Sequence, residues 1–315
     1  MTGSPANAAS SEPLTPRVVG FLRCPACRAA LTFHTALVCP AGHRFEVVDG
    51  VPRFAAMDSL DVGDRLLRQT AERFGYQWTR LAEDALVGLE QLRLHLPSGW
   101  GTEVLSGRVL DAGCGMGRYT ALVAQFSEEV VGLDLSTAVD EARRRWPNLA
   151  FIQGDLISPP FDDGTFDIVY SFGVLHHLPE PQQGFEACYR LVKPGGRLLV
   201  WVYSEHGGLF RTGRRWARAI CRVFPFARVP AAWTGALCIR LASRVHRSSA
   251  DRPQTRFAYR GIRQTYVDAY DALSAPKEVY VSEEECRRWL AAIDSVDKGY
   301  ETRGDGSGWI IWARK

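Results

Sequence analysis

The stretch VLDAGCGMGRYT, residues 109–120, gives the strongest indication of the chain's fold class. Its apolar start ends at an acid, Asp111. Three glycines then alternate with other residues: Gly113, Gly115 and Gly117. Glycines at this spacing let the backbone turn sharply and approach a bound group that a side chain would obstruct. A nicotinamide-binding loop has its third glycine three residues after the second, where this chain has Arg118, and this mismatch counts against a dehydrogenase.

Outward from this stretch, short apolar runs alternate with amphipathic segments, a pattern typical of a parallel sheet wrapped by helices. We expect strands at RVLDAG, VVGLDL, LAFIQGD, FDIVYSFG and RLLVWVY, and helices at RYTALVAQF and AVDEARRRW. Ser282 and Glu285 form a capping box for a helix through CRRWLAAI, and GWIIWARK is expected as the last edge strand. Ligands bind at the carboxyl ends of strands in such sheets, which makes Asp134, Asp155 and the stretch around His176 candidates.

Five motifs in fixed order connect the chain to a known family: VLDAGCGMGRYT, VVGLDLS, GD, FDIVYSFGVLHHL and LVKPGGRLLV. From about residue 66 to the end, the chain resembles the class I S-adenosylmethionine (SAM)-dependent methyltransferases. The resemblance implies an α/β, Rossmann-like fold with a seven-stranded, mostly parallel sheet whose last strand is antiparallel. It also implies SAM as cofactor and methyltransferase activity (EC 2.1.1).

The same resemblance assigns cofactor contacts residue by residue. The glycines approach the methionine portion of SAM, and Asp111 supports that loop and the cofactor's amino group. Asp134 accepts hydrogen bonds from both ribose hydroxyls, and Asp155 with the backbone of Leu156 meets the adenine amino group. The full expected set is Asp111, Gly113, Gly115, Gly117, Asp134, Leu135, Asp155, Leu156 and Phe172.

Two adjacent histidines, His176 and His177, follow the fourth expected strand and are the candidate catalytic residues. A hydroxyl acceptor needs a base, and a histidine suits proton removal near neutral pH. Adjacent side chains point in different directions, and His176 is slightly favoured; the alternative is that one or both histidines only cap or pack the next helix.

The residues just before this pair bear on the acceptor. Methyltransferases of base amino groups often have Asn-Pro-Pro-aromatic where this chain has Ser171-Phe172-Gly173-Val174. The difference weakens amino-group chemistry on bases and leaves ring-nitrogen chemistry open. SFGVLHHL resembles enzymes that methylate small molecules, sugars, lipids or quinones.

Four metal-ligand residues lie near the amino terminus: Cys24, Cys27, Cys39 and His43. Two Cys-containing knuckles at this spacing can hold zinc tetrahedrally, and a site with four protein ligands has no open position, which makes it structural. A disulfide or unliganded thiols are the alternatives. The segment resembles the Trm112-like zinc ribbons that precede some methyltransferases, and also the amino-terminal zinc module of ribosomal RNA guanine methyltransferases.

An insertion at residues 205–263 is rich in arginine, with thirteen arginines against the acids Glu205 and Asp251. WARAICRV and WTGALCIRLASRVHR have helical apolar spacing, and Pro225 and Pro230 between them predict a helical hairpin. Trp233 and Leu237 belong to the expected apolar face of the second helix. A cationic surface cap, a lid over an apolar or acidic acceptor, and docking on anionic lipid or RNA all stay open.

The segments divide the 315 residues into a disordered tail (1–16), a zinc ribbon (17–56), a helical cap (57–107) and the methyltransferase core (108–315). In the cap, Phe74, Tyr76 and Trp78 are expected to cover the cofactor cleft. The net charge of +3 is too small to argue for a nucleic-acid or membrane partner. No signal peptide and no apolar run of about 20 residues is seen, so we expect a cytoplasmic protein.

The leading hypothesis is SAM-dependent methylation, at oxygen, of a small-molecule, glycan or lipid-like acceptor. An RNA methyltransferase of the ribosomal RNA guanine type is the first alternative, and a non-catalytic SAM-binding scaffold is the second. Peripheral membrane contact through residues 205–263 also stays open. The sequence names neither the acceptor, the methylated atom nor the oligomeric state.

Overall fold

A computed structural model describes residues 14–55, 65–80, 87–205, 217–221, 224–245, 279–303 and 308–315, together with residues 262, 265–266, 269–270 and 273. The expected disordered tail therefore lies outside the described residues up to residue 13. Leu14 is buried, and Thr15 caps the helix α1 (Pro16–Phe21) by accepting a hydrogen bond from the Val18 amide.

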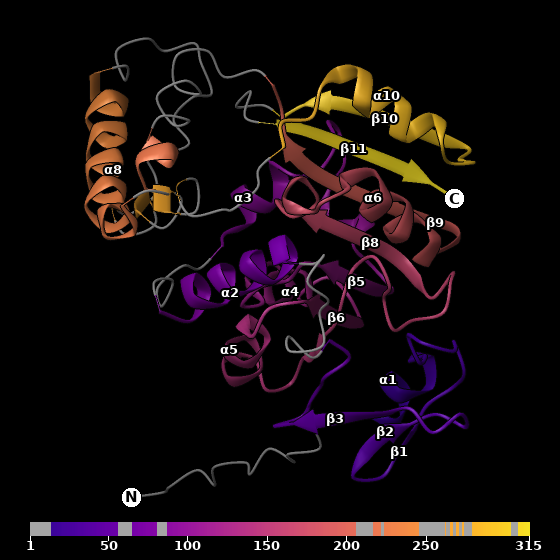
Figure 1. Cartoon of the computed structure of the whole chain (residues 1–315). Helices are drawn as coiled ribbons and strands as arrows, with labels where there is room; N and C mark the ends of the chain where they lie inside the picture. Colours follow the sequence, from indigo (N-terminus) through magenta and orange to yellow (C-terminus); the bar gives the residue numbers. More distant parts are fainter. Residues whose placement is uncertain are drawn as a thin grey trace, which may run out of the picture.

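A seven-stranded sheet forms the centre of the molecule (Figure 1), in the order β10-β11-β9-β8-β5-β6-β7. Its strands are β5 (Arg108–Ala112), β6 (Glu129–Asp134), β7 (Ala150–Gln153), β8 (Phe166–Phe172), β9 (Val192–Tyr203), β10 (Asp297–Thr302) and β11 (Gly308–Arg314). The five strands from β5 to β9 pair in parallel, and β11 is antiparallel to both of its neighbours. The expected Rossmann-like sheet with an antiparallel last strand is confirmed.

Two strands differ from the expectation. GWIIWARK is not an edge strand, because β11 lies between β9 and β10, and β10 forms the edge. β9 begins at Val192, five residues before the expected RLLVWVY, since Val192 already pairs with Phe166 of β8. Long-range pairing, which local apolar runs do not encode, decides both cases.

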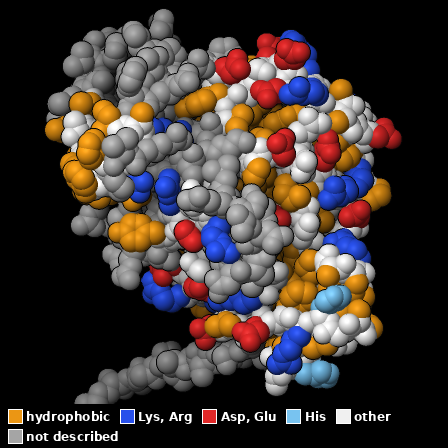
Figure 2. All heavy atoms as spheres, in the orientation of Figure 1, with side chains coloured by type: hydrophobic (Ala, Val, Ile, Leu, Met, Phe, Trp, Pro, Cys, Tyr) orange, Lys and Arg blue, Asp and Glu red, His pale blue; other side chains and the backbone are white. Residues whose placement is uncertain are grey.

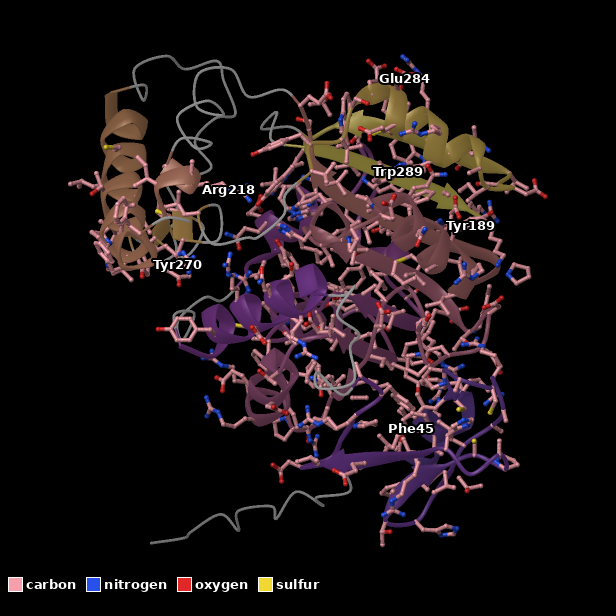
Figure 3. The ribbon with its side chains drawn as sticks, viewed as in Figure 1. Phe45, Tyr189, Arg218, Tyr270, Glu284 and Trp289 are labelled. Atoms are coloured by element: carbon pink, nitrogen blue, oxygen red, sulfur yellow. The ribbon has the colours of Figure 1, made fainter. Side chains whose placement is uncertain are left out.

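Helices pack on the faces of the sheet. They include α4 (Arg118–Val123), α5 (Ala138–Arg145), α6 (Pro181–Leu191) and α10 (Glu283–Ala291), and η4 (Leu175–His177) is a short 3-10 turn. The predicted capping box of α10 is present, with the Glu285 amide donating to Ser282 Oγ at 3.2 Å. Trp289 of α10, labelled in Figure 3, packs on Phe185 of α6, with ring centroids 5.6 Å apart.

The amino-terminal module is a four-stranded antiparallel sheet made of β1 (Thr32–Phe33), β2 (Ala36–Val38), β3 (Arg44–Val48) and β4 (Val51–Pro52). β1 and β2 form the expected hairpin, with the exposed His34 between them. The module joins the core through Phe21, whose ring lies 6.1 Å from that of Phe161. The two parts thus share one apolar core.

Between module and core lie α2 (Arg65–Arg80), α3 (Leu89–Arg93) and η3 (Thr102–Val104). Leu92, Leu96 and Leu105 are buried against strands β5, β6 and β8. Gly75 of α2 lies against the start of α5, where an added Cβ would come within 2.9 Å of Thr137 Oγ1. The described residues of this region therefore pack on one face of the sheet, over its inner strands.

The described part of the insertion contains η5 (Pro225–Ala227) and α8 (Arg228–Val245), and residues 217–221 are helical. Pro230 does not separate the two helices as expected. It lies in the first turn of α8, where a missing amide hydrogen breaks no helical hydrogen bond.

The buried face of α8 also differs from the expected one. Ala232 and Ala236 are buried, whereas Trp233 and Leu237 are exposed. Figure 2 shows hydrophobic side chains gathered over α8. In the part of the chain that the structure describes, no helix has the length and apolar character to cross a bilayer.

Candidate functional site

A glycine loop connects β5 to α4. Gly113, Gly115 and Gly117 all have positive φ angles, 92°, 53° and 77°, which favour glycine. At Gly113 the space is closed as well, because an added Cβ would lie 2.3 Å from Val174 Cγ2. At these three positions the loop therefore presents only backbone atoms, at the carboxyl end of β5.

Asp134 ends β6 and holds this loop. Its Oδ2 accepts a hydrogen bond from the Gly115 amide at 2.8 Å. Its Oδ1 accepts from the amide and the hydroxyl of Ser136, at 2.8 and 2.6 Å. Burial raises the pKa of Asp134 despite these bonds. A ligand that brings hydrogen-bond donors or positive charge would stabilise the ionised form.

Asp111 lies behind the loop. Its carboxylate accepts a hydrogen bond from Thr120 Oγ1 of α4 at 2.7 Å, and only 3% of the residue is exposed. Burial raises the pKa of Asp111 to about 7, although the Thr120 hydrogen bond acts in the opposite direction. The sequence placed Asp111 at the loop, and the structure gives it a contact to the helix that follows.

A pocket opens at the carboxyl ends of the parallel strands. Seven of the nine expected cofactor residues line it: Gly113, Gly115, Asp134, Leu135, Asp155, Leu156 and Phe172. Asp111 and Gly117 are not among the described lining residues. Of the histidine pair, His177 lines the pocket and His176 does not.

The pocket also contains residues that sequence reasoning missed. Thr70 and Ala71 come from α2, and no local pattern marks them, since the expected covering residues were aromatic ones further along that helix. Of those, Tyr76 is exposed, and the side chains of Phe74 and Trp78 lie outside the described set. The other additional lining residues are Cys114, Met116, Arg118, Tyr119, Leu133, Ser136, Gly154, Gly173, Val174 and Leu178.

The two histidines lie in the η4 turn, with ring centroids 4.2 Å apart. His176 is fully buried and stacks on Tyr203 at 4.0 Å, and its carbonyl accepts a hydrogen bond from Val279. His177 is also buried, at 6% exposed, but borders the pocket. Thus the geometry gives the pair two different surroundings: an aromatic stack for His176 and a pocket wall for His177.

The four expected metal ligands come together in the amino-terminal module. Their ligand atoms all lie within 4.8 Å of one another. Cys27 Sγ lies 3.6 Å from Cys39 Sγ, and His43 Nδ1 lies 3.5 Å from Cys24 Sγ and 3.3 Å from Cys39 Sγ. A tetrahedral zinc ion with Zn–S bonds of about 2.3 Å has ligand-to-ligand distances of about 3.5–3.8 Å. The donor set and its spacing therefore fit zinc, and the cysteines are free thiols in this structure.

Comparison with known proteins agrees with the geometry. Residues 110–200 match the family model of a methyltransferase domain. The demethylmenaquinone methyltransferase of Beutenbergia cavernae is 43% identical over 99 residues, 31% of this chain and 41% of that protein. The ubiquinone biosynthesis O-methyltransferase of Xanthomonas oryzae is 30% identical over 129 residues, 39% of this chain and 54% of that protein.

Among solved structures, a SAM-dependent methyltransferase from Mesorhizobium loti is 18% identical, with a TM-score of 0.42 over 72% of this chain and 98% of that one.

The chain spans 36% to 54% of the length of the curated relatives. The strand order and the match over residues 110–200 together identify a class I SAM-dependent methyltransferase domain in this chain. It is preceded by a Cys3His cluster with the geometry of a zinc ribbon.

Proposed function

We propose that this chain transfers the methyl group of SAM to a hydroxyl of a small-molecule, glycan or lipid-like acceptor. One observation carries the proposal: His177 lines the same pocket as the glycine loop and Asp134. A group able to take a proton thus borders the space in which cofactor and acceptor would meet.

The adenosine of SAM fits the Asp134 side of the pocket. The carboxylate of Asp134 is suited to the ribose hydroxyls, and Asp155 and Leu156, which line the same pocket, are assigned to the adenine. Arg118 directly follows the glycine loop and also lines the pocket. Its guanidinium is suited to the carboxylate of the methionine portion, while the bare backbone of Gly113 and Gly115 admits that portion at close range.

The bound cofactor would supply a methyl group on a positively charged sulfur, which is a good leaving group. The protein's task is to align the acceptor, exclude water and remove the hydroxyl proton. We assign the last role to His177 and give His176 a positioning role, because the Tyr203 stack and the backbone bond from Val279 hold the turn that carries both. This choice reverses the slight preference that the sequence gave to His176.

The acceptor side is apolar. Val174 and Leu178 line the pocket, and Met116 joins it to a cluster with Ala232 and Ala236 of α8 and with Tyr266 and Tyr270. Figure 3 places Tyr270 beside α8. An acceptor with an apolar body suits these walls, and the quinone methyltransferases among the relatives are in keeping with this class.

The metal cluster has a separate role in this proposal. Cys24, Cys27, Cys39 and His43 use all four tetrahedral positions for protein atoms, so zinc bound there would be structural. No residue of the cluster lines the described pocket.

Radiolabelled SAM, added with the purified chain to a cell extract, tests the proposal. The extract is afterwards separated into RNA, protein, lipid and small polar fractions. Label in the lipid or small-molecule fraction supports it. Label confined to RNA would favour the ribosomal RNA guanine type of activity instead, and SAM binding without transfer to any fraction would favour the scaffold.

A further inference from the structure

The metal cluster and the cofactor pocket are connected by a continuous set of strands. β2 ends at Val38, directly before the ligand Cys39, and β3 begins at Arg44, directly after the ligand His43. The far end of β3 pairs with β4, where Val48 lies opposite Val51. One short strand therefore connects the cluster to β4.

The residue after β4 joins the module to the main sheet. Arg53 forms a parallel bridge with Gln153, the last residue of β7, and the Phe54 amide donates to the Gln153 carbonyl at 2.8 Å. On the module side, the Arg53 amide donates to the Glu46 carbonyl of β3 at 2.8 Å. Since β7 is the edge strand opposite β10, this segment extends the large sheet beside the pocket.

Gln153 connects Arg53 to residues that line the pocket. Its side chain is buried, accepts a hydrogen bond from Arg53 Nη1 at 3.2 Å and donates from Nε2 to the Leu135 carbonyl at 3.1 Å. The next residue, Gly154, donates its amide to the Asp134 carbonyl at 3.0 Å. Leu135, Asp134 and Gly154 all line the pocket. The Arg53 guanidinium is also paired with Asp140 of α5.

A second, apolar contact runs to the back of the glycine loop. Val51 is fully buried in a cluster with Cys114, Val139, Ala142 and Phe151. Cys114 belongs to the loop, and the Phe151 ring lies against Gly117, where an added Cβ would come within 2.8 Å of it. On the other side, Phe45 of β3, labelled in Figure 3, packs on Phe54 with ring centroids 4.8 Å apart.

We propose that metal binding at the Cys3His cluster strengthens SAM binding in the pocket, with Arg53 and Gln153 as the positioning residues that connect the two sites. The inference rests on the proposed SAM site. An ordered cluster holds β3 and β4 in register, which holds Arg53 on Gln153 and so fixes the backbone of Leu135 and Asp134. Without metal the module loosens, and part of the free energy of SAM binding is spent on ordering this wall.

Coupling between two binding sites is reciprocal, and typical values correspond to about 5- to 150-fold in affinity. We therefore expect SAM to bind at least about fivefold more tightly to zinc-loaded chain than to metal-free chain. By the same linkage, saturating SAM makes zinc at least about fivefold harder to remove with a chromophoric chelator. A module that only added global stability would change unfolding and leave the SAM affinity of the folded chain unchanged.

The decisive comparison uses the full chain in its zinc-loaded form. Arg53→Gln removes the guanidinium that joins Gln153 and Asp140, and it is expected to weaken SAM binding at least about fivefold in calorimetric titration. Arg28→Gln is the matched control, because Arg28 also ties the module to the core, through the Pro159 carbonyl at 2.9 Å, without contacting Gln153. Its SAM affinity is expected to stay within about twofold of wild type, which is below the coupling range.

Equal SAM affinities of Arg53→Gln and Arg28→Gln would overturn the inference while leaving the proposed function intact. The same holds if zinc removal from folded wild-type chain leaves SAM affinity unchanged. If the metal-free chain does not stay folded, removal of zinc by the chelator, compared with and without saturating SAM, still decides the question. Wild-type chain that carries zinc and binds no SAM would overturn the proposed function, and the coupling with it.

Discussion

The Asp134 carboxylate and the Gly115 amide are joined by a hydrogen bond of 2.8 Å, which ties the end of β6 to the middle of the glycine loop. One acid thus shapes the loop and borders the pocket. Any ligand that uses this carboxylate also meets a loop whose position the same carboxylate fixes.

Asp134→Asn should weaken SAM binding by about 10- to 100-fold, the equivalent of one charge-assisted hydrogen bond. The amide has one acceptor oxygen where the carboxylate has two, so its NH2 group faces either the Gly115 amide or the Ser136 donors, and the hydrogen bonds on that side are lost. Calorimetric titration of SAM measures the effect. Asp297→Asn, on the exposed part of β10, is the control with the same chemical change and should bind as wild type does. Equal affinity of the two variants would remove Asp134 from the SAM site.

Asp111→Asn should stabilise the SAM-free protein at high pH. Burial raises the pKa of Asp111 to about 7, so the folded state favours the protonated acid, and the stability this gives is complete below the ordinary pKa. It is lost as pH rises toward 7. Relative to wild type, the free energy of unfolding of the variant should therefore increase by about 2–3 kcal/mol between pH 5 and pH 8.

Urea unfolding of both proteins at these two pH values checks the Asp111 prediction. Because Asp134 is present in both, its own raised pKa largely cancels in the comparison. If the difference in unfolding free energy between variant and wild type does not change with pH, Asp111 is not a buried carboxyl that titrates in this range.

Gly113→Ala should destabilise the chain by more than the strain of a positive φ alone. Gly113 has φ 92° and its added Cβ would lie 2.3 Å from Val174 Cγ2. Gly195→Ala is a matched control, since Gly195 has φ 82° and no atom within 4 Å of its added Cβ. We expect about 1 kcal/mol for the control and at least about 2 kcal/mol for Gly113→Ala. Only Gly113→Ala should also weaken SAM binding. An equal loss of unfolding free energy in both variants would show that the Val174 side chain can move to accommodate the added methyl group.

His177→Gln should lower kcat by about 100-fold or more, the usual contribution of a general base, while the Kd of SAM stays near that of wild type. His34→Gln changes an exposed histidine of the amino-terminal hairpin and should have no effect on either value. Single-turnover transfer to the acceptor, with SAM binding measured separately, distinguishes the two quantities. A variant with unchanged kcat would rule out His177 as the base.

Cys39→Ala should reduce the zinc content of the purified chain from about one ion to nearly none and lower the thermal midpoint, because structural zinc contributes directly to folding. Cys238→Ala removes an exposed cysteine outside the cluster and should leave both unchanged. Elemental analysis and thermal unfolding measure the two effects. Zinc in both variants would place the metal at another site, and zinc in neither would show that the cluster does not hold it.

The sheet and the glycine loop were predictable because local sequence determines them. Short apolar runs define β5 to β8, and the positive φ values of Gly113, Gly115 and Gly117 favour glycine. The metal ligands could also be predicted from the sequence. Short spacings bring Cys24 close to Cys27 and Cys39 close to His43.

What the sequence could not supply depends on packing between distant segments. Nothing local in α2 marks Thr70 as a pocket residue, and nothing in β11 says that a later strand lies between two earlier ones. In α8 the small residues Ala232 and Ala236 are buried, since they permit a close approach that Trp233 would prevent. The link between Arg53 and Gln153 joins residues one hundred positions apart.

A crystal structure of the zinc-loaded chain with S-adenosylhomocysteine, the demethylated product of SAM, would test the central claim most directly. We predict the ribose hydroxyls on the Asp134 carboxylate, the amino-acid portion on the glycine loop, and the sulfur facing the pocket wall that contains His177. A ligand bound away from these residues, or a sulfur on the side remote from His177, would contradict the proposed site and its chemistry.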